Sequence, residues 1–238
     1  LIKQNKLTNL EKDGITTIPF NYKTIIKNKK FTHLYTTVKN NKVGICVPYR
    51  DRENHLSLFL PNITNYLINS SINFKIYIVS QEDSKTLNRG ALKNIAAKYA
   101  LEDGCDYVAF HDIDMLVEDA DYSYVKSPTR IATEFKPMAG KYNYRNYFGG
   151  VVLLSREHLV KTNGYSNEYW GWGAEDDDLL LRCKFNNFTN NGHPYIKKGI
   201  FKVLKHPKTG TLDYASHLSD KNVDRLNFML DGKINFKN

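Results

Sequence analysis

The stretch DYVAFHDID, residues 106–114, joins a short run of apolar and aromatic side chains to two aspartates. The run is typical of a buried β-strand, and Asp112 and Asp114 follow where that strand should end. Residues two apart in an extended chain point the same way. The stretch therefore predicts a strand that brings two carboxylates to one side of its end.

The segments before this stretch predict an alternation of strands and helices. We expect strands at 43–47 and 74–80 and helices at 53–68 and 88–104, with a break or kink at Pro61. Such an alternation favours an α/β sheet of parallel strands joined by right-handed crossovers. Ligands of these sheets bind at the carboxyl ends of the strands, where the two aspartates fall.

The second half of the chain predicts a continuation of the same domain. It carries a strand and a helix within 147–165, a helix over 175–187 and a strand over 200–206. We expect a single α/β domain over residues 41–238, with a central, mostly parallel sheet flanked by helices. Residues 1–40 are polar and weakly patterned, and we expect them to form an extension packed on that domain.

The composition is that of a globular protein with a basic surface. Of the 238 residues, 41% are hydrophobic and 25% are charged, which excludes global disorder. The net charge of +9 suits a nucleotide, a nucleic acid or an acidic membrane surface, or it reflects a composition rich in lysine and asparagine.

The cysteines and the hydropathy give an expectation for the location of the protein. Cys46, Cys105 and Cys183 match no disulfide or zinc pattern, and no run of about 18 apolar residues predicts a membrane span. We expect reduced thiols and a cytoplasmic protein, with at most peripheral contact to the inner membrane, rather than a resident of a Golgi-type lumen. The chain starts with Leu1 and not with methionine, which leaves a preceding anchor open.

Two motifs at strand ends suit a nucleotide substrate. Hard cations such as Mn²⁺ or Mg²⁺ bind carboxylate oxygens and share them with substrate phosphates, so Asp112 and Asp114 fit a metal site. A turn that uses aspartate for local hydrogen bonds is the alternative explanation. Arg50 and Arg52 follow the first strand, where guanidinium groups suit a diphosphate, although arginines are also common at surface turns.

The stretch EYWGWGAEDDDLLLRC, residues 168–183, contains both tryptophans of the chain and four consecutive acids. One or two acids would cap the following helix and complement its dipole. Four adjacent acids repel one another, which indicates that some of them meet a ligand. Aromatic rings beside carboxylates fit a sugar site, where a carboxylate can also serve as a general base on a hydroxyl.

These motifs together resemble the β-1,4-galactosyltransferase family. The resemblance is carried by YFGGVVLLSREHLVKTNGYSNEYWGWGAEDDDLLLR (147–182), and by VPYRDRENHL, LNRGALKNIA, FHDID and KVLKH in the same order. It implies a GT-A type nucleotide-sugar-binding fold and an inverting transfer of galactose from UDP-galactose, with Mn²⁺, or Mg²⁺ in its place. The paired cysteines of the family are absent, which favours a bacterial or viral relative over a Golgi enzyme.

The resemblance also implies a role for each matching residue at the donor side. Asp114 and His206 would be metal ligands, and Val203 stands where the family has a methionine ligand, so that water or a residue such as His217 would complete the metal shell. Tyr147 would limit the room around C2 of the sugar and favour galactose over N-acetylgalactosamine. The implied donor-binding residues are Pro48, Arg50, Arg52, Arg89, Asp112, Asp114, Tyr147 and Trp172.

At the acceptor side, the resemblance implies that Asp176 is the catalytic base. Trp172 would lie in a loop that closes over the donor and then builds the acceptor site. The implied acceptor-binding residues are Gly150, Trp172, Glu175 and Asp177. The acceptor would be a glycan or a lipid-linked saccharide, and its identity stays open.

Four alternatives remain at this stage. A transferase that uses UDP-GalNAc or another UDP-sugar, in the synthesis of capsule or glycosaminoglycan-like polymers, would share the WGWG and acidic motif. A glycan-binding module without catalysis would not need the D-x-D element, Asp176 or His206. A glycosidase would use paired carboxylates but not a basic diphosphate edge. We expect no nucleic-acid binding, because the aromatic residues cluster in the sugar-type motif and do not interleave with basic ones.

Overall fold

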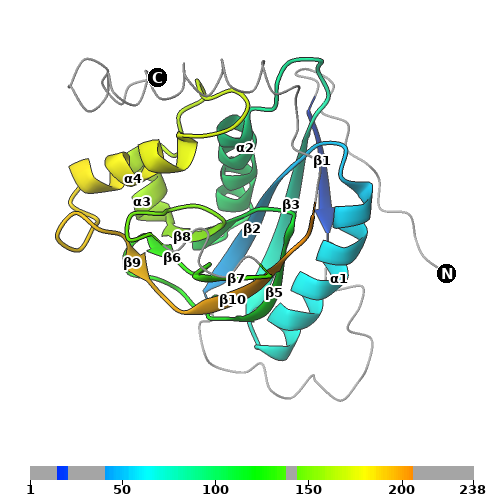
Figure 1. Ribbon diagram of the computed structural model, residues 1–238, viewed down its shortest axis with the longest axis horizontal. Helices are drawn as coiled ribbons and strands as arrows, with labels where there is room; N and C mark the ends of the chain where they lie inside the picture. Colours follow the sequence, from blue (N-terminus) through cyan, green and yellow to red (C-terminus); the bar gives the residue numbers. More distant parts are fainter. Residues whose placement is uncertain (1–14, 21–40, 138–143, 206–238) are drawn as a thin grey trace.

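The structure is a computed structural model that describes residues 15–20, 41–137 and 144–205 (Figure 1). Within these ranges the strands form two sheets. The larger sheet has the order β1-β3-β2-β4-β8-β6-β9, and the smaller one has the order β5-β10-β7. The strands are β1 (Ile15–Phe20), β2 (Lys42–Tyr49), β3 (Asn73–Gln81), β4 (Tyr107–His111), β5 (Met115–Ala120), β6 (Thr129–Arg130), β7 (Glu134–Lys136), β8 (Val151–Ser155), β9 (Tyr195–Ile196) and β10 (Gly199–Val203).

The larger sheet is mixed, with a parallel centre. The pairs β2–β3 and β2–β4 are parallel, as the alternation of strands and helices predicts. Strand β8 runs antiparallel to both β4 and β6, and β1, which falls in the predicted extension, runs antiparallel to β3. The predicted mostly parallel sheet is therefore confined to its centre, because the chain reaches β8 through the small sheet and not through a crossover helix.

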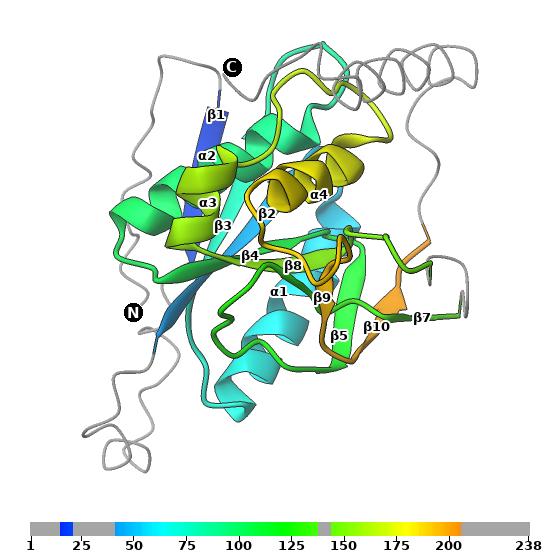
Figure 2. The same ribbon diagram turned by 90° about the vertical axis from the view of Figure 1, so that its left-hand side faces the viewer.

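Helices cover both faces of the larger sheet (Figures 1 and 2). Helices α2 (Arg89–Glu102), α3 (Arg156–Thr162) and α4 (Glu175–Phe185) pack on one face, and α1 (Glu53–Asn69) packs with the small sheet on the other. The alternation along β4 produces this arrangement: Tyr107 and Ala109 join the core under α1, while Val108 and Phe110 join the core under α2.

Helix α1 continues through Pro61, where the sequence predicted a break or kink. Pro61 is exposed, while Phe59, Ile63 and Leu67 form a buried stripe on the other side of the helix. Burial of that stripe on both sides of Pro61 offsets the lost backbone hydrogen bond.

The described part of the chain contains no helix that combines the length and the apolar character needed to cross a membrane. Cys46, Cys105 and Cys183 are all buried and are not joined in disulfides.

Candidate active site

The candidate site forms where the carboxyl end of β4 meets the first turn of α4. Lys93 of α2 connects the two: its Nζ lies 3.6 Å from Asp112 Oδ1 and 3.6 Å from Asp176 Oδ1. The Asp112 N–H donates to the carbonyl of Gly150, just before β8, over 3.1 Å. The structure thus brings the D-x-D element, the YFGG segment and the acidic helix start into one place.

Asp112 and Asp114 follow the end of β4, and Asp114 lies in the turn that leads to β5 rather than in an extended strand. Both are half-buried, whereas His111, Ile113 and Met115 between and beside them are buried. Burial raises the pKa of Asp112, and the charge of Lys93 opposes that rise. The carbonyl of Asp114 accepts a 2.7 Å hydrogen bond from the N–H of Leu204, which fastens the D-x-D element to the residues after β10.

The two carboxylate oxygens of Asp176 have different surroundings. Oδ1 accepts a 3.2 Å hydrogen bond from the hydroxyl of Tyr165 and faces Lys93. Oδ2 lies against Gly149, where an added Cβ would collide with it and would come within 2.8 Å of the hydroxyl of Tyr147. Glycine is therefore required at position 149, because only a residue without a side chain lets the backbone approach this carboxylate so closely.

Burial raises the pKa of Asp176 to about 7. The positive charges of Lys93 and Arg89 work against the rise, and the negative charges of Glu175 and Asp112 add to it. A carboxylate with a pKa near neutrality is suited to accept a proton from a hydroxyl and to release it afterwards.

Three of the four acids at the start of α4 have partners of their own, which reduces the repulsion among them; Asp176 contacts Lys93 and Tyr165 as described above. The side chain of Glu175 is buried and pairs with Arg89 over 2.6 Å. Asp178 is fully buried and pairs with Arg182. Asp177 is half-buried, and burial together with the charge of Glu175 raises its pKa. Of the two acids implied for the acceptor, Asp177 is thus the more accessible, while Glu175 joins α4 to α2.

The loop before α4 presents one tryptophan to solvent. The Trp172 side chain is 61% exposed, whereas Trp170 is half-buried and lies under the ammonium group of Lys85 at 5.7 Å. The Gly171 N–H donates to the carbonyl of Leu87 over 2.8 Å, so the middle of this loop rests on the residues before α2. Trp172 is therefore positioned to contact a ligand beside α4.

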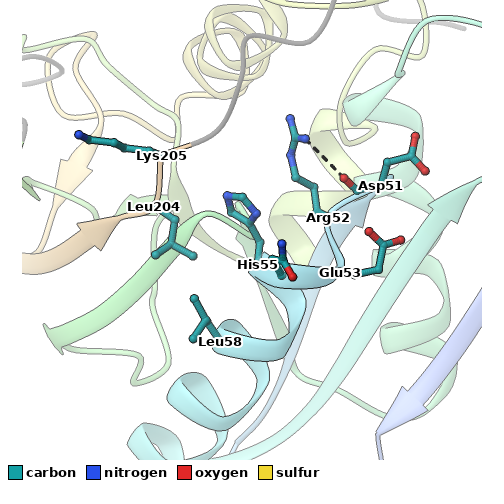
Figure 3. Close-up of a pocket in the computed structure, with 8 residues that line it drawn as sticks. Asp51, Arg52, Glu53, His55, Leu58, Leu204 and Lys205 are labelled. Atoms are coloured by element: carbon teal, nitrogen blue, oxygen red, sulfur yellow. Dashed lines mark hydrogen bonds between the residues drawn. The ribbon is translucent and has the colours of Figure 1, made fainter.

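A cavity of about 410 Å³ opens at the start of α1, next to the residues that follow β10 (Figure 3). Arg52, His55 and Lys205 line it, and Figure 3 shows the imidazole of His55 between the side chains of the other two. Asp51 and Glu53 line the same cavity, so its charged lining is mixed. Leu204 also lines it, and because the N–H of Leu204 donates a hydrogen bond to the carbonyl of Asp114, the cavity adjoins the D-x-D element.

For three other residues, Arg50, Pro48 and Gly150, the resemblance implies contacts with a substrate, but their contacts in the structure are mainly with the protein itself. The guanidinium of Arg50 donates to the carbonyls of Asp83 and Lys85, which holds the loop after β3. Pro48 is buried within β2. Gly150 has a φ of +74° and is buried against Met115 and Ala132, and its carbonyl serves Asp112.

The buried side chain of Arg130 contacts both the ring and the carbonyl group of Tyr147. The Arg130 guanidinium lies 5.4 Å from the centroid of the Tyr147 ring and donates to the carbonyl of Tyr147 over 2.9 Å. The phenol hydroxyl then reaches the same space as Asp176 Oδ2. A sugar at Asp176 would therefore meet Tyr147.

The described residues form no group of three or more His, Cys, Asp or Glu side chains that would enclose a metal. The implied ligand His206 and the candidate His217 lie outside the described residues, and Val203 is half-buried against the core. Of the implied metal ligands, Asp114 is the one that the structure describes. Its half-buried carboxylate is a hard oxygen ligand of the type that Mn²⁺ and Mg²⁺ prefer.

The sequence reasoning missed two residues of the site, Lys93 and Tyr165. Lys93 shares the buried face of α2 with Leu92, Ala96 and Ala100, and a lysine at that helical position was a signal that could have been noticed. Tyr165 follows α3, and nothing in its local sequence indicated that its hydroxyl reaches Asp176.

Comparison with protein families gives two adjoining matches. The N-terminal region of glycosyl transferase group 7 matches residues 5–127, and the N-terminal domain of galactosyltransferase matches residues 129–207. Among curated proteins, human β-1,4-galactosyltransferase 4 is 40% identical over 171 residues, covering 70% of this chain and 49% of the relative. Drosophila melanogaster β-1,4-galactosyltransferase 7 is 34% identical over 185 residues, covering 76% of this chain and 53% of the relative. The chain thus spans about half the length of these relatives.

Solved structures of a β-1,4-galactosyltransferase also align with this chain. The catalytic domain of Drosophila β-1,4-galactosyltransferase 7 in complex with xylobiose aligns with a TM-score of 0.65 and 30% identity, covering 76% of this chain and 80% of that one. A mutant of that enzyme in complex with manganese, UDP-Gal and xylobiose aligns with a TM-score of 0.64 and 31% identity, covering 72% and 76%. The fold is therefore the GT-A type that the sequence predicted. The chain belongs to the β-1,4-galactosyltransferase family.

Proposed function

We propose that this protein is an inverting glycosyltransferase that moves galactose from UDP-galactose to a hydroxyl of an acceptor saccharide, with a β-1,4 linkage. The observation that carries the proposal is the setting of Asp176, which is anchored through Oδ1 and presents Oδ2 beside Tyr147. The family membership and the solved relative that binds UDP-Gal and xylobiose support the choice of donor and acceptor class.

The donor diphosphate would lie in the cavity at the start of α1, on the side of Arg52 and Lys205 and away from Asp51 and Glu53. Arg52 and Lys205 offer positive charge there, and Asp114 is linked to the same cavity through Leu204. Asp112 would accept hydrogen bonds from donor hydroxyls, and Trp172 would cover the sugar.

Asp114 and His206 would hold a divalent cation, with Mn²⁺ preferred and Mg²⁺ as the alternative. When bound, such a cation supplies positive charge that stabilises the departing diphosphate. The solved relative in complex with manganese and UDP-Gal supports this choice.

The chemical step would be a single displacement. Asp176 Oδ2 takes the proton of the acceptor hydroxyl while the acceptor oxygen forms a bond to the anomeric carbon. The bond between that carbon and the UDP oxygen breaks on the opposite face, and its electron pair leaves with UDP. Tyr165 and Lys93 keep Oδ1 in place, so that the proton is accepted on the side of the substrate.

Tyr147 supports galactose as the transferred sugar. Its hydroxyl shares the space beside Gly149 with Asp176 Oδ2, which leaves little room for an N-acetyl group at C2. The competing assignment is a transferase for UDP-GalNAc or another UDP-sugar.

A donor–acceptor screen tests the proposal. UDP-Gal, UDP-GalNAc, UDP-Glc and UDP-GlcNAc are each offered with Mn²⁺ or Mg²⁺ to N-acetylglucosamine, glucose and xyloside acceptors, and the product linkage is determined by NMR. We expect a β-1,4-linked galactoside. Faster turnover of UDP-GalNAc than of UDP-Gal, or an α-linked product, would overturn the assignment.

A further inference from the structure

We infer that Lys93 is a positioning residue that holds the catalytic base Asp176 and the donor-side carboxylate Asp112 in one arrangement and keeps Asp176 ready to accept a proton. The inference rests on the proposed function, and it assigns a role to Lys93, a residue of the LNRGALKNIA segment to which the resemblance gave no role.

The position of Lys93 is unusual for a lysine. Its side chain is 2% exposed, and its Nζ lies between two carboxylates that come from different elements, the end of β4 and the first turn of α4. Burial of an ammonium group is costly unless opposite charges compensate it. The two aspartates supply that compensation, and Lys93 in turn offsets the repulsion between them.

Tyr165 completes the arrangement. The ammonium group of Lys93 lies 4.8 Å from the centroid of the Tyr165 ring and 3.5 Å from its hydroxyl, which donates to Asp176 Oδ1. Phe110 packs edge-on against the same ring at 5.0 Å. Lys93 and Tyr165 therefore approach Asp176 from the same side, and together they fix Oδ1.

The charge of Lys93 also acts on the proton affinity of Asp176. Burial alone favours the protonated acid, and Lys93 is the largest opposing influence. The groups that face Asp176 from the surrounding elements are Lys93 and Arg89 of α2, Asp112 after β4, Tyr165 after α3, Tyr147 before β8 and Glu175 of its own helix. Removal of Lys93 would leave the acids without their closest positive charge, so Asp176 would hold its proton at neutral pH.

The first test compares Lys93→Met with the wild type in transfer assays from pH 5.5 to pH 9. The matched control is Lys98→Met, which removes an exposed lysine from the same helix. We expect Lys93→Met to lose about tenfold or more of kcat/KM at pH 6.5 and to recover part of the loss at pH 9. The reason is that the acid limb of the pH–rate profile, where Asp176 gains its proton, moves up by about 1–3 pH units. Lys93→Arg keeps the charge and should keep the acid limb near its wild-type position. A loss of equal size at every pH would show that Lys93 is only structural and would overturn the inference.

The second test does not use activity. The stability of Asp176→Asn relative to its parent is measured by urea unfolding across pH in EDTA, in the wild-type background and in Lys93→Met. In both backgrounds the gap between the two curves should open near the ordinary pKa of the carboxyl, 3.8. We expect the gap to stop growing at a higher pH, and to end larger, in the Lys93→Met background. If Lys93→Met does not fold, Lys93→Gln takes its place in both tests, since it is also neutral and can form hydrogen bonds.

The two tests separate the inference from the proposed function. If the gap stops growing at the same pH and reaches the same size in the neutral Lys93 variants as in the wild-type background, the inference is overturned, whatever the activity. Absence of transfer by the wild type from every UDP-sugar overturns the proposed function, and the stability measurement then decides alone whether Lys93 controls Asp176.

Discussion

The surroundings of Asp176 show how a buried acid could act as the proposed base. One oxygen is taken by Tyr165 and Lys93, and the other faces the glycine segment where a sugar would bind. The same burial that raises the pKa of the group to about 7 makes its charged form costly in the folded protein. The burial that would suit Asp176 to accept a proton at neutral pH therefore lowers the stability of the folded protein when this carboxylate is ionised.

The opposition gives a prediction about stability and pH. The pKa of Asp176 lies above its ordinary value of 3.8, so the stability that Asp176 contributes is present at low pH and is lost as the pH rises to about 7. Asparagine cannot titrate, so Asp176→Asn should gain stability over the wild type across this range, by up to about 4 kcal/mol at pH 7.5. Urea unfolding at several pH values in EDTA measures the difference. The exposed Asp119→Asn is the control and should show no such trend.

A second prediction at this scale concerns the choice of donor. Replacing Tyr147 by leucine opens space beside Asp176 Oδ2, so turnover of UDP-GalNAc relative to UDP-Gal should rise about tenfold or more. Competition between the two donors in one reaction measures the ratio. An unchanged ratio would mean that a side chain other than Tyr147 determines which donor sugar is preferred.

The sequence located most of the site residues because each belongs to a contiguous motif. Asp112, Asp114 and Asp176 could be named from local spacing or from the resemblance to the family. Lys93 could not be assigned a role in this way, because its partners come from two other elements and meet only after folding. The pairing of Glu175 with Arg89 was missed for the same reason.

At the scale of elements, the loop before α4 is attached to α2 by two asparagines: Asn88, whose amide donates to the carbonyl of Asn167 over 2.5 Å, and Asn94. The Asn94 amide donates to the carbonyl of Tyr165 over 2.8 Å and to Asn167 Oδ1 over 2.9 Å, and its oxygen accepts from the N–H of Tyr165 over 2.9 Å. Asn94 thus fixes the start of the loop that carries Trp172 and, through Tyr165, the orientation of Asp176.

Asn94→Ala should therefore loosen this loop without unfolding the protein. We expect faster hydrogen exchange over residues 165–174 and a kcat reduced by about tenfold or more, because misplaced catalytic groups lose rate steeply. Hydrogen exchange followed by mass spectrometry measures the first effect and initial rates the second. Lys98→Ala, at an exposed position of the same helix, is the control. Unchanged exchange over the loop would contradict this role of Asn94.

The elements themselves were predictable to different degrees. The strands and helices from β2 to β4 have clear periodicity, and the structure confirms them with shifts of at most three residues at their ends. Strand β1 was not predicted, because residues 1–40 are polar and weakly patterned. Strands β6 and β9 contain two residues each, too few for a pattern. The direction of β8 could not be inferred, because it depends on the path of the chain through the small sheet and not on the sequence of β8 itself.

At the scale of the whole molecule, the two sheets meet at the candidate site. Asp114 lies between β4 of the large sheet and β5 of the small one. The N–H of Leu204, after β10, donates a hydrogen bond to the carbonyl of Asp114. A donor bound in the adjoining cavity would contact the start of α1 and the residues after β10 together. Donor binding should therefore stabilise the molecule as a whole.

The expected result is that UDP with Mn²⁺ raises the Tm of the protein by more than UDP with EDTA. Saturation at about 100 times Kd adds about 2.7 kcal/mol to the free energy of unfolding, which is a shift of several degrees. Differential scanning fluorimetry with UDP, Mn²⁺, both and neither measures it. Arg52→Ala should reduce the shift, because Arg52 supplies positive charge to the lining of this cavity. Equal shifts with and without metal would contradict a shared site for diphosphate and cation.

The transfer rate of Asp176→Asn at pH 7.5, with UDP binding measured on the same samples, tests the central claim most directly. The variant keeps the shape of the side chain and removes its ability to take a proton. We predict a loss of about 10²-fold to 10⁴-fold in kcat with little change in the affinity for UDP. Transfer that stays near the wild-type rate would show that Asp176 is not the base.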